Sequence, residues 1–175
     1  MFPTGYESNN YSISYEQATV SITPLQVTVT VNPDALSKTY GDIDPELTYT
    51  LSSDISSLPT SGTLSRTVGE DVGTYTIGLG TLSNPNYDFT LDPAEFAITP
   101  LSVTVTPDAL SKTYGDIDPE LTYTLSSDIS SLPTTGTLSR TVGENVGTYA
   151  IGLGTLSNPN YDFTLDPAEF AITPL

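Results

Sequence analysis

The five residues Lys-Thr-Tyr-Gly-Asp stand at positions 38–42 and return unchanged at positions 112–116, an offset of 74. At this offset residues 33–101 match residues 107–175 at every position but three. The three changes are Ser61 to Thr135, Asp71 to Asn145 and Thr76 to Ala150. A self-similarity this close at a fixed period indicates two consecutive copies of one structural unit.

The first apolar segment of each copy sets the boundaries between the units. Residues 26–33 are two positions longer than the equivalent residues 102–107. We therefore assign one repeat domain to residues 25–100 and a second to residues 101–175. Residues 1–24 repeat the Asn-Tyr and Ile-Thr-Pro of a unit's ending at the same spacing, and Leu25 follows as Leu101 does. We interpret them as the tail of a preceding repeat, and we expect the array to continue upstream.

The composition excludes several classes of function. The chain has 175 residues with no cysteine and no histidine, so it can form no Ser–His–Asp triad, thiol nucleophile or Cys/His zinc site. Its 21 acidic and 4 basic residues give a net charge of −17, which repels nucleic acid and anionic membranes. No apolar run approaches the ~18 residues of a membrane span. We predict a chain that is no enzyme, binds no nucleic acid and inserts into no membrane.

Apolar and polar residues alternate in each unit with the period of two that is typical of β-strands. The clearest strands lie at residues 25–31, 47–51, 75–79 and 87–91, with a closing strand near 96–98 and weaker candidates at 36–40 and 63–67. Clusters of Pro, Gly, Asn and Asp separate these segments and indicate turns. Helical spacing is absent over any ~10-residue stretch, and at most one short turn is expected near residues 53–58.

Each unit is thus predicted to hold six or seven short strands in about 75 residues. The fold class that we predict is all-β, with two tandem small antiparallel β-sandwich (Ig-like) domains. A β-grasp-like sheet is the alternative. The core predicted for the first unit, with equivalents in the second, consists of Val27, Val29, Leu47, Tyr49, Leu51, Leu64, Tyr75, Ile77, Leu79, Tyr87, Phe89, Phe96 and Ile98.

The junction between the units contains no Gly/Ser spacer. Pro100 fixes its own φ and holds Thr99 in an extended conformation, so the two domains should bend little relative to each other. A string of such domains needs its entry and exit at opposite poles, which favours a first and a last strand that run in the same direction. Because a domain of this size is marginal alone, we expect contact between neighbouring repeats to supply part of the stability.

Several short motifs of the unit occur together. They are Lys-Thr-Tyr-Gly-Asp at 38–42, Pro-Glu-Leu-Thr-Tyr at 45–49, Gly-Thr-Leu-Ser-Arg at 62–66, Val-Gly-Thr-Tyr at 72–75 and Phe-Ala-Ile-Thr-Pro at 96–100. In this combination the chain resembles the MBG-type repeat domains, which occur in tandem in large bacterial surface and adhesin-like proteins. The resemblance implies secretion and a location at the bacterial cell surface, and it supplies no catalytic residue.

An acidic run is the best candidate for a metal site. Asp42, Asp44 and Glu46 form an Asp-x-Asp-x-Glu pattern, which the second unit repeats at Asp116, Asp118 and Glu120. Carboxylate oxygens are the ligands that Ca²⁺ prefers, so calcium is the one cofactor that we consider. The run lacks the glycine and the distal glutamate of an EF-hand loop. The alternative is an acidic turn closed by Asp side chains and Pro45.

The lysine and tyrosine side chains suggest two further sites. Lys38 and Lys112 are the only lysines of their units, and each is a candidate for an isopeptide crosslink to a nearby Asn or Asp side chain. The alternative for each is an ordinary ion pair with an aspartate. Tyr40 and Tyr114 are the best candidates for exposed ligand-binding rings. The other strand tyrosines fall on the apolar phase and are expected in the core.

These features favour a structural spacer. Repeated acidic β-domains would hold a distal binding domain of a surface adhesin away from the cell, with neighbouring repeats of the same chain as partners. The negative charge would keep adjacent identical units soluble and discourage their mispairing. The alternative is a module in which each unit binds a host or matrix glycan or protein weakly and many copies give avidity.

Overall fold

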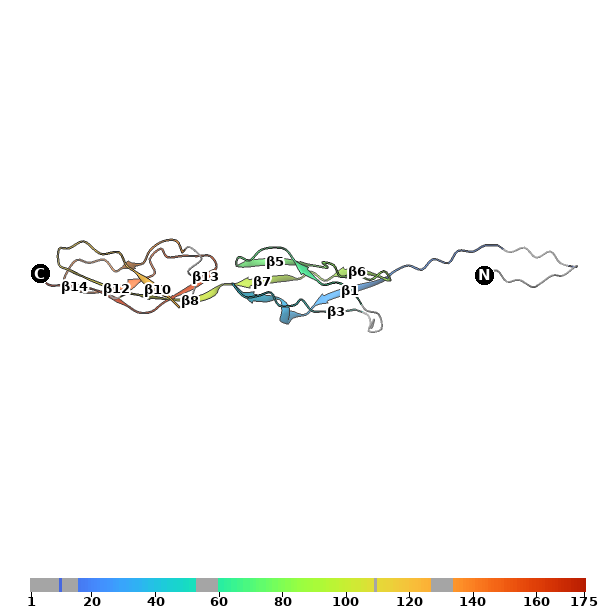
Figure 1. Cartoon of the computed structure of the whole chain (residues 1–175), viewed down its shortest axis with the longest axis horizontal. Helices are drawn as coiled ribbons and strands as arrows, with labels where there is room; N and C mark the ends of the chain where they lie inside the picture. Colours follow the sequence, from blue (N-terminus) through green and yellow to red (C-terminus); the bar gives the residue numbers. More distant parts are fainter. Residues whose placement is uncertain (1–9, 11–15, 53–59, 109, 127–133) are drawn as a thin grey trace.

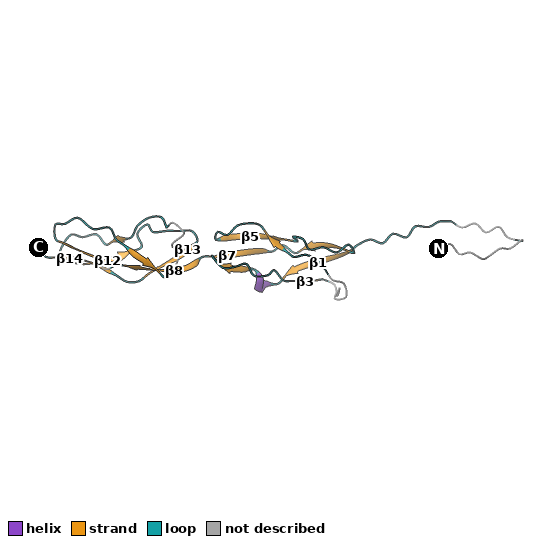
Figure 2. Ribbon diagram, in the orientation of Figure 1, coloured by secondary structure: helices purple, strands orange, loops and turns teal. Residues whose placement is uncertain are grey.

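The computed structural model describes residue 10 and residues 16–52, 60–108, 110–126 and 134–175. Two β-rich units lie end to end along the long axis of the molecule, and residues 16–24 extend away from the first (Figure 1). Within the described residues the only helical element is a 3-10 turn, η1 (Pro33–Ala35) (Figure 2). The all-β fold class and the two tandem small β domains are confirmed. The turn that we expected near residues 53–58 lies outside the described residues.

The described residues of each repeat form seven strands at equivalent positions. Repeat 1 has β1 (Leu25–Val31), β2 (Ser37–Thr39), β3 (Tyr49–Leu51), β4 (Ser65–Arg66), β5 (Gly73–Gly78), β6 (Tyr87–Leu91) and β7 (Glu95–Thr99). Repeat 2 has β8 (Leu101–Pro107), β9 (Leu110–Thr113), β10 (Tyr123–Leu125), β11 (Ser139–Arg140), β12 (Gly147–Gly152), β13 (Tyr161–Leu165) and β14 (Glu169–Thr173). The weaker strand candidates of the sequence are therefore present as β2 and β4.

The strands of each repeat form two sheets. In repeat 1 the orders are β3-β1-β6 and β2-β7-β5-β4, and repeat 2 has the equivalent β10-β8-β13 and β9-β14-β12-β11. The sheets are mixed rather than purely antiparallel, since β1 pairs with β6 and β2 pairs with β7 in parallel. Figure 1 shows β1 and β7 running in the same direction, as we predicted for a chain that enters and leaves at opposite poles. Two parallel pairings are the consequence, because the first and last segments of the unit lie side by side.

The core of repeat 1 lies between these sheets and is smaller than we predicted. The buried apolar residues are Val27, Val29, Val31, Leu64, Ile77, Leu82, Phe96 and Ile98. The sequence missed Val31 and Leu82. The prediction was wrong for Leu47, Tyr49, Leu51, Tyr75, Leu79, Tyr87 and Phe89, which are only partly buried. A unit of about 75 residues has too small an interior to bury all of the apolar side chains of its strands, so these side chains cover the edge of the core.

The leader shows the opposite behaviour. Residues 16–24 have no assigned strand, and Val20 and Ile22 are more than nine-tenths exposed. By the spacing of the shared motifs these two positions correspond to Phe96 and Ile98 of repeat 1, which are buried. If residues 16–24 are the tail of a preceding repeat, they should carry apolar side chains at the positions of a core strand, and these should be exposed where the rest of that repeat is not beside them. That interpretation stays a prediction.

Candidate functional site

A tight turn follows the second strand of each repeat and places the acidic run. The amide of Asp42 donates to the carbonyl of Thr39 over 3.1 Å, which closes a four-residue turn. Gly41 occupies the third position with φ of +88°, a value that a type II turn requires and that glycine adopts without strain. Gly115 has φ of +92° in repeat 2. The Tyr-Gly-Asp motif is therefore a turn signal, and it brings Asp44 back over β2.

Four charged side chains meet beside this turn, and we call them the charged cluster: Lys38, Asp44, Arg66 and Glu70. Lys38 is buried on β2, and its Nζ lies 2.7 Å from Oδ1 of Asp44 and also contacts Glu70. Arg66, at the end of β4, reaches both oxygens of Asp44, with Nε 2.6 Å from Oδ2 and a second nitrogen 3.0 Å from Oδ1. Glu70 accepts a further bond from the same guanidinium at 2.7 Å. Each carboxylate thus bridges both cations.

The guanidinium of Arg66 is held on every side. It donates to the backbone carbonyls of Thr67 at 3.0 Å and Gly69 at 2.6 Å. Its Cζ lies 4.9 Å from the ring centre of Tyr75 and 5.2 Å from that of Phe96. Stacking on two rings and bidentate pairing with a carboxylate are properties that arginine has and lysine lacks. The Arg66 side chain therefore covers one end of the core while its charge is fully paired.

Repeat 2 builds the same cluster from Lys112, Asp118, Arg140 and Glu144. Nζ of Lys112 lies 2.7 Å from Oδ1 of Asp118, and Nε of Arg140 lies 2.6 Å from Oδ2 of the same carboxylate. These two clusters contain all 4 of the basic residues of the chain. Four of the 21 acidic residues lie with them, so the net charge of −17 comes from carboxylates for which no lysine or arginine remains.

The cluster favours the ionised form of each member. Hydrogen bonds from Arg66, and then from Lys38, lower the pKa of Asp44 to about 2. Asp118 has a pKa of about 2 for the same reason, with Arg140 as the main donor. Bonds to Asp44 and then to Glu70 raise the pKa of Lys38, and bonds from Lys38 and then from Arg66 lower the pKa of Glu70. Fixed charges of this kind hold the β2–β3 segment against β4 and do not exchange protons near neutral pH.

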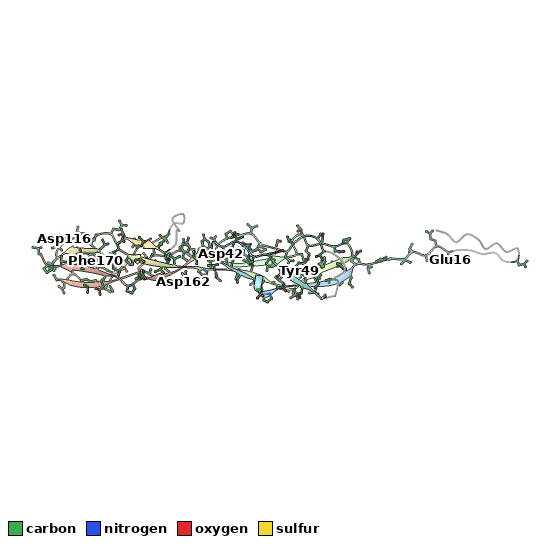
Figure 3. The ribbon with its side chains drawn as sticks, turned by 60° about the horizontal axis from the view of Figure 1, so that its bottom comes forward. Glu16, Asp42, Tyr49, Asp116, Asp162 and Phe170 are labelled. Atoms are coloured by element: carbon green, nitrogen blue, oxygen red, sulfur yellow. The ribbon has the colours of Figure 1, made fainter. Side chains whose placement is uncertain are left out.

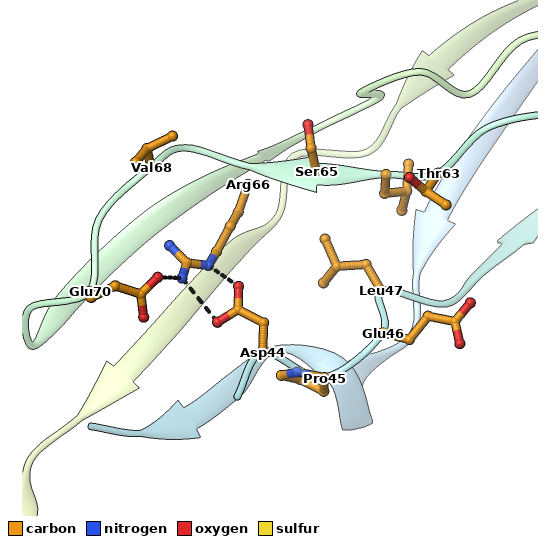
Figure 4. Close-up of a pocket in the computed structure, with 10 residues that line it drawn as sticks. Asp44, Pro45, Glu46, Leu47, Thr63, Ser65, Arg66, Val68 and Glu70 are labelled. Atoms are coloured by element: carbon orange, nitrogen blue, oxygen red, sulfur yellow. Dashed lines mark hydrogen bonds and ion pairs between the residues drawn. The ribbon is translucent and has the colours of Figure 1, made fainter. Parts of the chain in front are cut away.

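A shallow groove lies beside the cluster in repeat 1. It has a volume of about 460 Å³, and Figure 4 shows Leu47 pointing into it from the segment after Pro45, with Asp44 and Arg66 at one end. Val68, on the loop above, is fully exposed, as is its equivalent Val142. A smaller hollow of about 300 Å³ lies beside the cluster of repeat 2. These are open surface features that could accept a side chain or a sugar edge, but not enclose a substrate.

The second site is the joint between the repeats, and Asn160 is its central residue. The side chain of Asn160 accepts a hydrogen bond from the backbone N–H of Val72 at 2.8 Å and donates to Oδ1 of Asp71 at 2.9 Å. Its backbone N–H donates to the side chain of Asn158 at 2.9 Å, and its carbonyl accepts from Leu101 at 3.0 Å. Asn160 therefore belongs to the fold of repeat 2 through its backbone and binds repeat 1 through its side chain.

Aromatic contact completes the joint. Tyr161 packs edge-on against Tyr40 of repeat 1, with ring centres 5.6 Å apart, and its other neighbour is Phe163 at 5.7 Å. The hydroxyl of Tyr161 is buried without a hydrogen-bond partner, and burial raises its pKa. One residue, Pro100, separates β7 from β8, and the carbonyl of Thr99 just before it accepts from the amide of Tyr40 at 2.8 Å. The chain is thus bonded on both sides of the proline, as the prediction of a stiff joint requires.

Because the two repeats are nearly identical in sequence, a comparison of the exposure of equivalent residues shows what the joint buries. Asn160 and Tyr161 are 6% and 7% exposed, whereas Asn86 is exposed and Tyr87 only half-buried. The other half of the joint shows the same contrast. Tyr40 and Val72 are half-buried in repeat 1, but their equivalents Tyr114 and Val146 at the far end of repeat 2 are 49% and 52% exposed. Apart from Asn145, which stands where repeat 1 has Asp71, each repeat therefore carries both halves of the joint, and they are buried where a neighbouring repeat contacts them.

The structure separates the predicted calcium ligands. Asp44 and Asp118 are bound by arginine and lysine, whereas Asp42, Glu46, Asp116 and Glu120 are exposed. Figure 3 shows Asp42 at the end of repeat 1 that faces repeat 2, and Asp116 at the far end of repeat 2. Among the residues that the structure describes, no three acidic side chains are grouped as metal ligands. The alternative of an acidic turn describes this arrangement, and calcium binding stays a prediction.

The other predicted sites are placed as follows. Lys38 and Lys112 form ion pairs with Asp44 and Asp118, the alternative that we considered for them. The crosslink itself is not tested by this geometry and stays a prediction. Tyr40 is not an exposed ring, because Tyr161 covers it. Tyr114 is exposed, and ligand binding there also stays a prediction.

Sequence reasoning missed four residues of these two sites: Arg66, Glu70, Asp71 and Asn160. Tyr161 was predicted as a core residue, the equivalent of Tyr87, and it is buried, but its contact with the other repeat was not predicted. Arg66 had a signal, because each unit contains one arginine and one lysine among many acidic residues. A lone cation pairs with those carboxylates that the fold brings within reach, and the sequence does not say which ones these are. Asn160 had none. Its identical copy Asn86 makes no contact with another repeat in the described structure, so the sequence around it cannot distinguish the two.

Fold and sites together define a class: a tandem array of small all-β units, joined end to end through contacts that each unit carries. The sequence model of the MBG domain (YGX type) matches residues 28–97 and again residues 103–171, and the chain belongs to this family. The comparisons with curated proteins and with solved structures found no match. Among the described residues no helix is long and apolar enough to cross a membrane.

Proposed function

We propose that this chain is a spacer region of a bacterial cell-surface protein of the adhesin type, and that it lies outside the cell. In this role the repeats hold a distal binding domain at a distance, and the number of repeats sets that distance. The family supports the proposal through its tandem arrangement, and the joint carries it. A spacer needs stiffness between its units, which Asn160, Tyr161 and the single linking Pro100 supply.

The strands give an estimate of the length that each repeat contributes. Strands β6 and β7 run from residue 87 to residue 99 in one direction along the long axis (Figure 1). At about 3.3 Å per extended residue this segment corresponds to roughly 40 Å per repeat. The unpaired carboxylates act in the same sense as the joint, because repulsion between consecutive units opposes folding of the array back on itself.

Small-angle X-ray scattering of the whole chain tests the proposal. We expect the scattering of a rod, and we expect the double variant Asn160→Ala/Tyr161→Ala to scatter as two units joined by a flexible hinge. The matched control is Asn86→Ala/Tyr87→Ala, which changes the same two residue types away from the joint. Hinge-like scattering from the unaltered chain would contradict the spacer proposal.

A second candidate function is a weak multivalent binding module for a glycan or protein of the host or matrix. The supporting observation is that each repeat exposes two apolar side chains almost completely: Ile43 and Val68 in repeat 1, Ile117 and Val142 in repeat 2. Val68 lies beside the shallow groove. A glycan array tests this function, with Val68→Ser/Val142→Ser as the variant. Glycan binding that the variant loses would support this function. If the unaltered chain binds no glycan on the array, this function is contradicted and the spacer proposal is the one that remains.

A further inference from the structure

Two segments run side by side over the whole length of each repeat. We call residues 25–39, which contain β1 and β2, the entry segment, and residues 87–99, which contain β6 and β7, the exit segment. In one sheet the parallel register runs from Leu25↔Tyr87 to Val29↔Leu91, and in the other from Ser37↔Ala97 to Thr39↔Thr99. Both segments change from one sheet to the other at the same level, so they remain neighbours throughout.

Backbone hydrogen bonds also join these segments outside the two ladders. At the start of the repeat, Leu25 donates to the carbonyl of Asn86 at 2.9 Å. In the middle, Asp92 donates to Val29 at 2.9 Å and Ala97 donates to Leu36 at 2.8 Å. The last bond, from Tyr40 to Thr99 at 2.8 Å, lies next to the exit. The entry and exit segments are therefore bonded from one pole to the other.

Side chains on the outer face reinforce the pairing. In repeat 1, Gln26 donates to Asp88 and Thr30 donates to Asp92, each over 2.6 Å. Repeat 2 keeps the second of these bonds, from Thr106 to Asp166 at 2.7 Å. On the inner face, β1 and β7 contribute the largest fully buried side chains of repeat 1 among its described residues, which are Val27, Val29 and Phe96. Sliding one segment along the other would break these contacts together.

The geometry points to a mechanical function: each repeat is a clamp that resists tension along the chain, because tension loads its two parallel ladders in shear. Tension enters at the first residue of β1 and leaves at the last residue of β7, at opposite poles of the unit (Figure 1). It therefore pulls the entry and exit segments in opposite directions along their own length. All of the bonds between them share the load, whereas a pull across one end of a ladder breaks its bonds one after another.

This inference goes beyond the spacer proposal, which requires length and stiffness but no resistance to force. A rod whose repeats unfold at low force would agree with the spacer proposal and contradict the clamp. A flexible array whose repeats resist high force would agree with the clamp and contradict the spacer proposal. Scattering therefore tests the first property and force tests the second, so the two failures are distinguishable.

Single-molecule force spectroscopy of the whole chain tests the clamp. The chain has no cysteine, so Ser102→Cys/Asp162→Cys gives two attachment points on exposed, directly paired residues of β8 and β13. The two cysteines are kept reduced until they are attached. A pull through these two residues opens the ladder of repeat 2 from one end. Pulled through the termini, the same double variant has its ladders loaded in shear. Because the same double variant is pulled in both directions, any effect of the two substitutions on stability is present in both measurements.

We expect pulling through the termini to require a several-fold higher force than pulling through residues 102 and 162. Each terminal unfolding event should release roughly 220 Å of chain, from about 75 residues at ~3.5 Å less the folded length of about 40 Å. Two such events are expected, one for each repeat. Equal forces in the two directions, or extension of the repeats at the force of the peeled ladder, would overturn the inference.

Discussion

Replacement of Tyr161 by alanine, compared with the same change at Tyr87, isolates the energy of the joint. The two tyrosines have the same neighbours within their own repeats, with Phe89 5.8 Å from Tyr87 and Phe163 5.7 Å from Tyr161. Among the described residues, Tyr161 also contacts the preceding repeat, through Tyr40, and no equivalent ring contact is present at Tyr87. Losses within the repeat therefore cancel in the comparison, and the remainder is the contribution of the joint.

The size of that remainder follows from the contacts. An edge-on aromatic pair contributes about 0.5–1.5 kcal/mol beyond the area that it buries, and buried apolar area adds about 25 cal/mol per Å². Since Tyr161 changes from half-buried to 7% exposed through the joint, we expect Tyr161→Ala to lower the free energy of unfolding by roughly 2 kcal/mol more than Tyr87→Ala. For about 150 residues that difference corresponds to roughly 4–8 °C in Tm.

Urea unfolding followed by circular dichroism measures this difference, and a double-mutant cycle attributes it. Tyr40→Ala combined with Tyr161→Ala should show a coupling energy of about 0.5–1.5 kcal/mol. The control cycle, Tyr114→Ala with Tyr87→Ala, combines the same residue types at the two poles of the repeat pair that face away from this joint, and it should show none. Equal losses for Tyr161→Ala and Tyr87→Ala, or coupling in both cycles, would refute the view that this joint stabilises the array.

Three further outcomes are expected. Tyr161→Phe removes a buried hydroxyl that has no partner, so the free energy of unfolding in urea should rise by about 1 kcal/mol, and a fall would mean that the hydroxyl is bonded. Asp44 and Asp118 have a pKa of about 2 in the folded chain against an ordinary 3.8, so their stabilisation is complete above pH 3.8 and is lost as the pH falls through 2. Acid unfolding followed by circular dichroism should show this loss, and the Asp44→Asn/Asp118→Asn chain should lack it; an unchanged acid transition in that variant would exclude the clusters as its cause. Arg66→Ala should lower the unfolding free energy by about 2–4 kcal/mol, because it removes carboxylate, carbonyl and ring contacts at once, whereas Glu70→Gln, at an exposed side chain, should lower it much less; the reverse order in urea titrations would contradict this view of the cluster.

The sequence was sufficient for those features that depend on local pattern. The offset of 74 defined the repeat, and alternation located the strands, including the weak candidates that became β2 and β4. Glycine at position 41 marked a turn because only a residue that tolerates positive φ fits there. Such signals are local, since each is written in a few neighbouring residues and does not depend on what the rest of the chain does.

The charged cluster lay only partly within reach of the sequence. Its acidic half was visible as the run around Asp44, and Lys38 was singled out as the only lysine of its unit. Arg66 and Glu70 lie more than 20 residues further along, and only the packing of β4 against β5 brings them to Asp44. For that reason the run was considered as a candidate calcium site, with an acidic turn as the alternative, and its pairing with two cations was not foreseen in full.

The tertiary structure alone decided the parallel pairing of the entry and exit segments and the burial of the joint. Alternation states which face of a strand is apolar but not which strand lies beside it, so the parallel ladders could not be derived from it. Asn86 and Asn160 occupy identical sequence surroundings, yet one is exposed and the other is buried between two repeats. Burial is a property of two surfaces in contact, and an identical residue acquires it only where a neighbouring unit supplies the second surface.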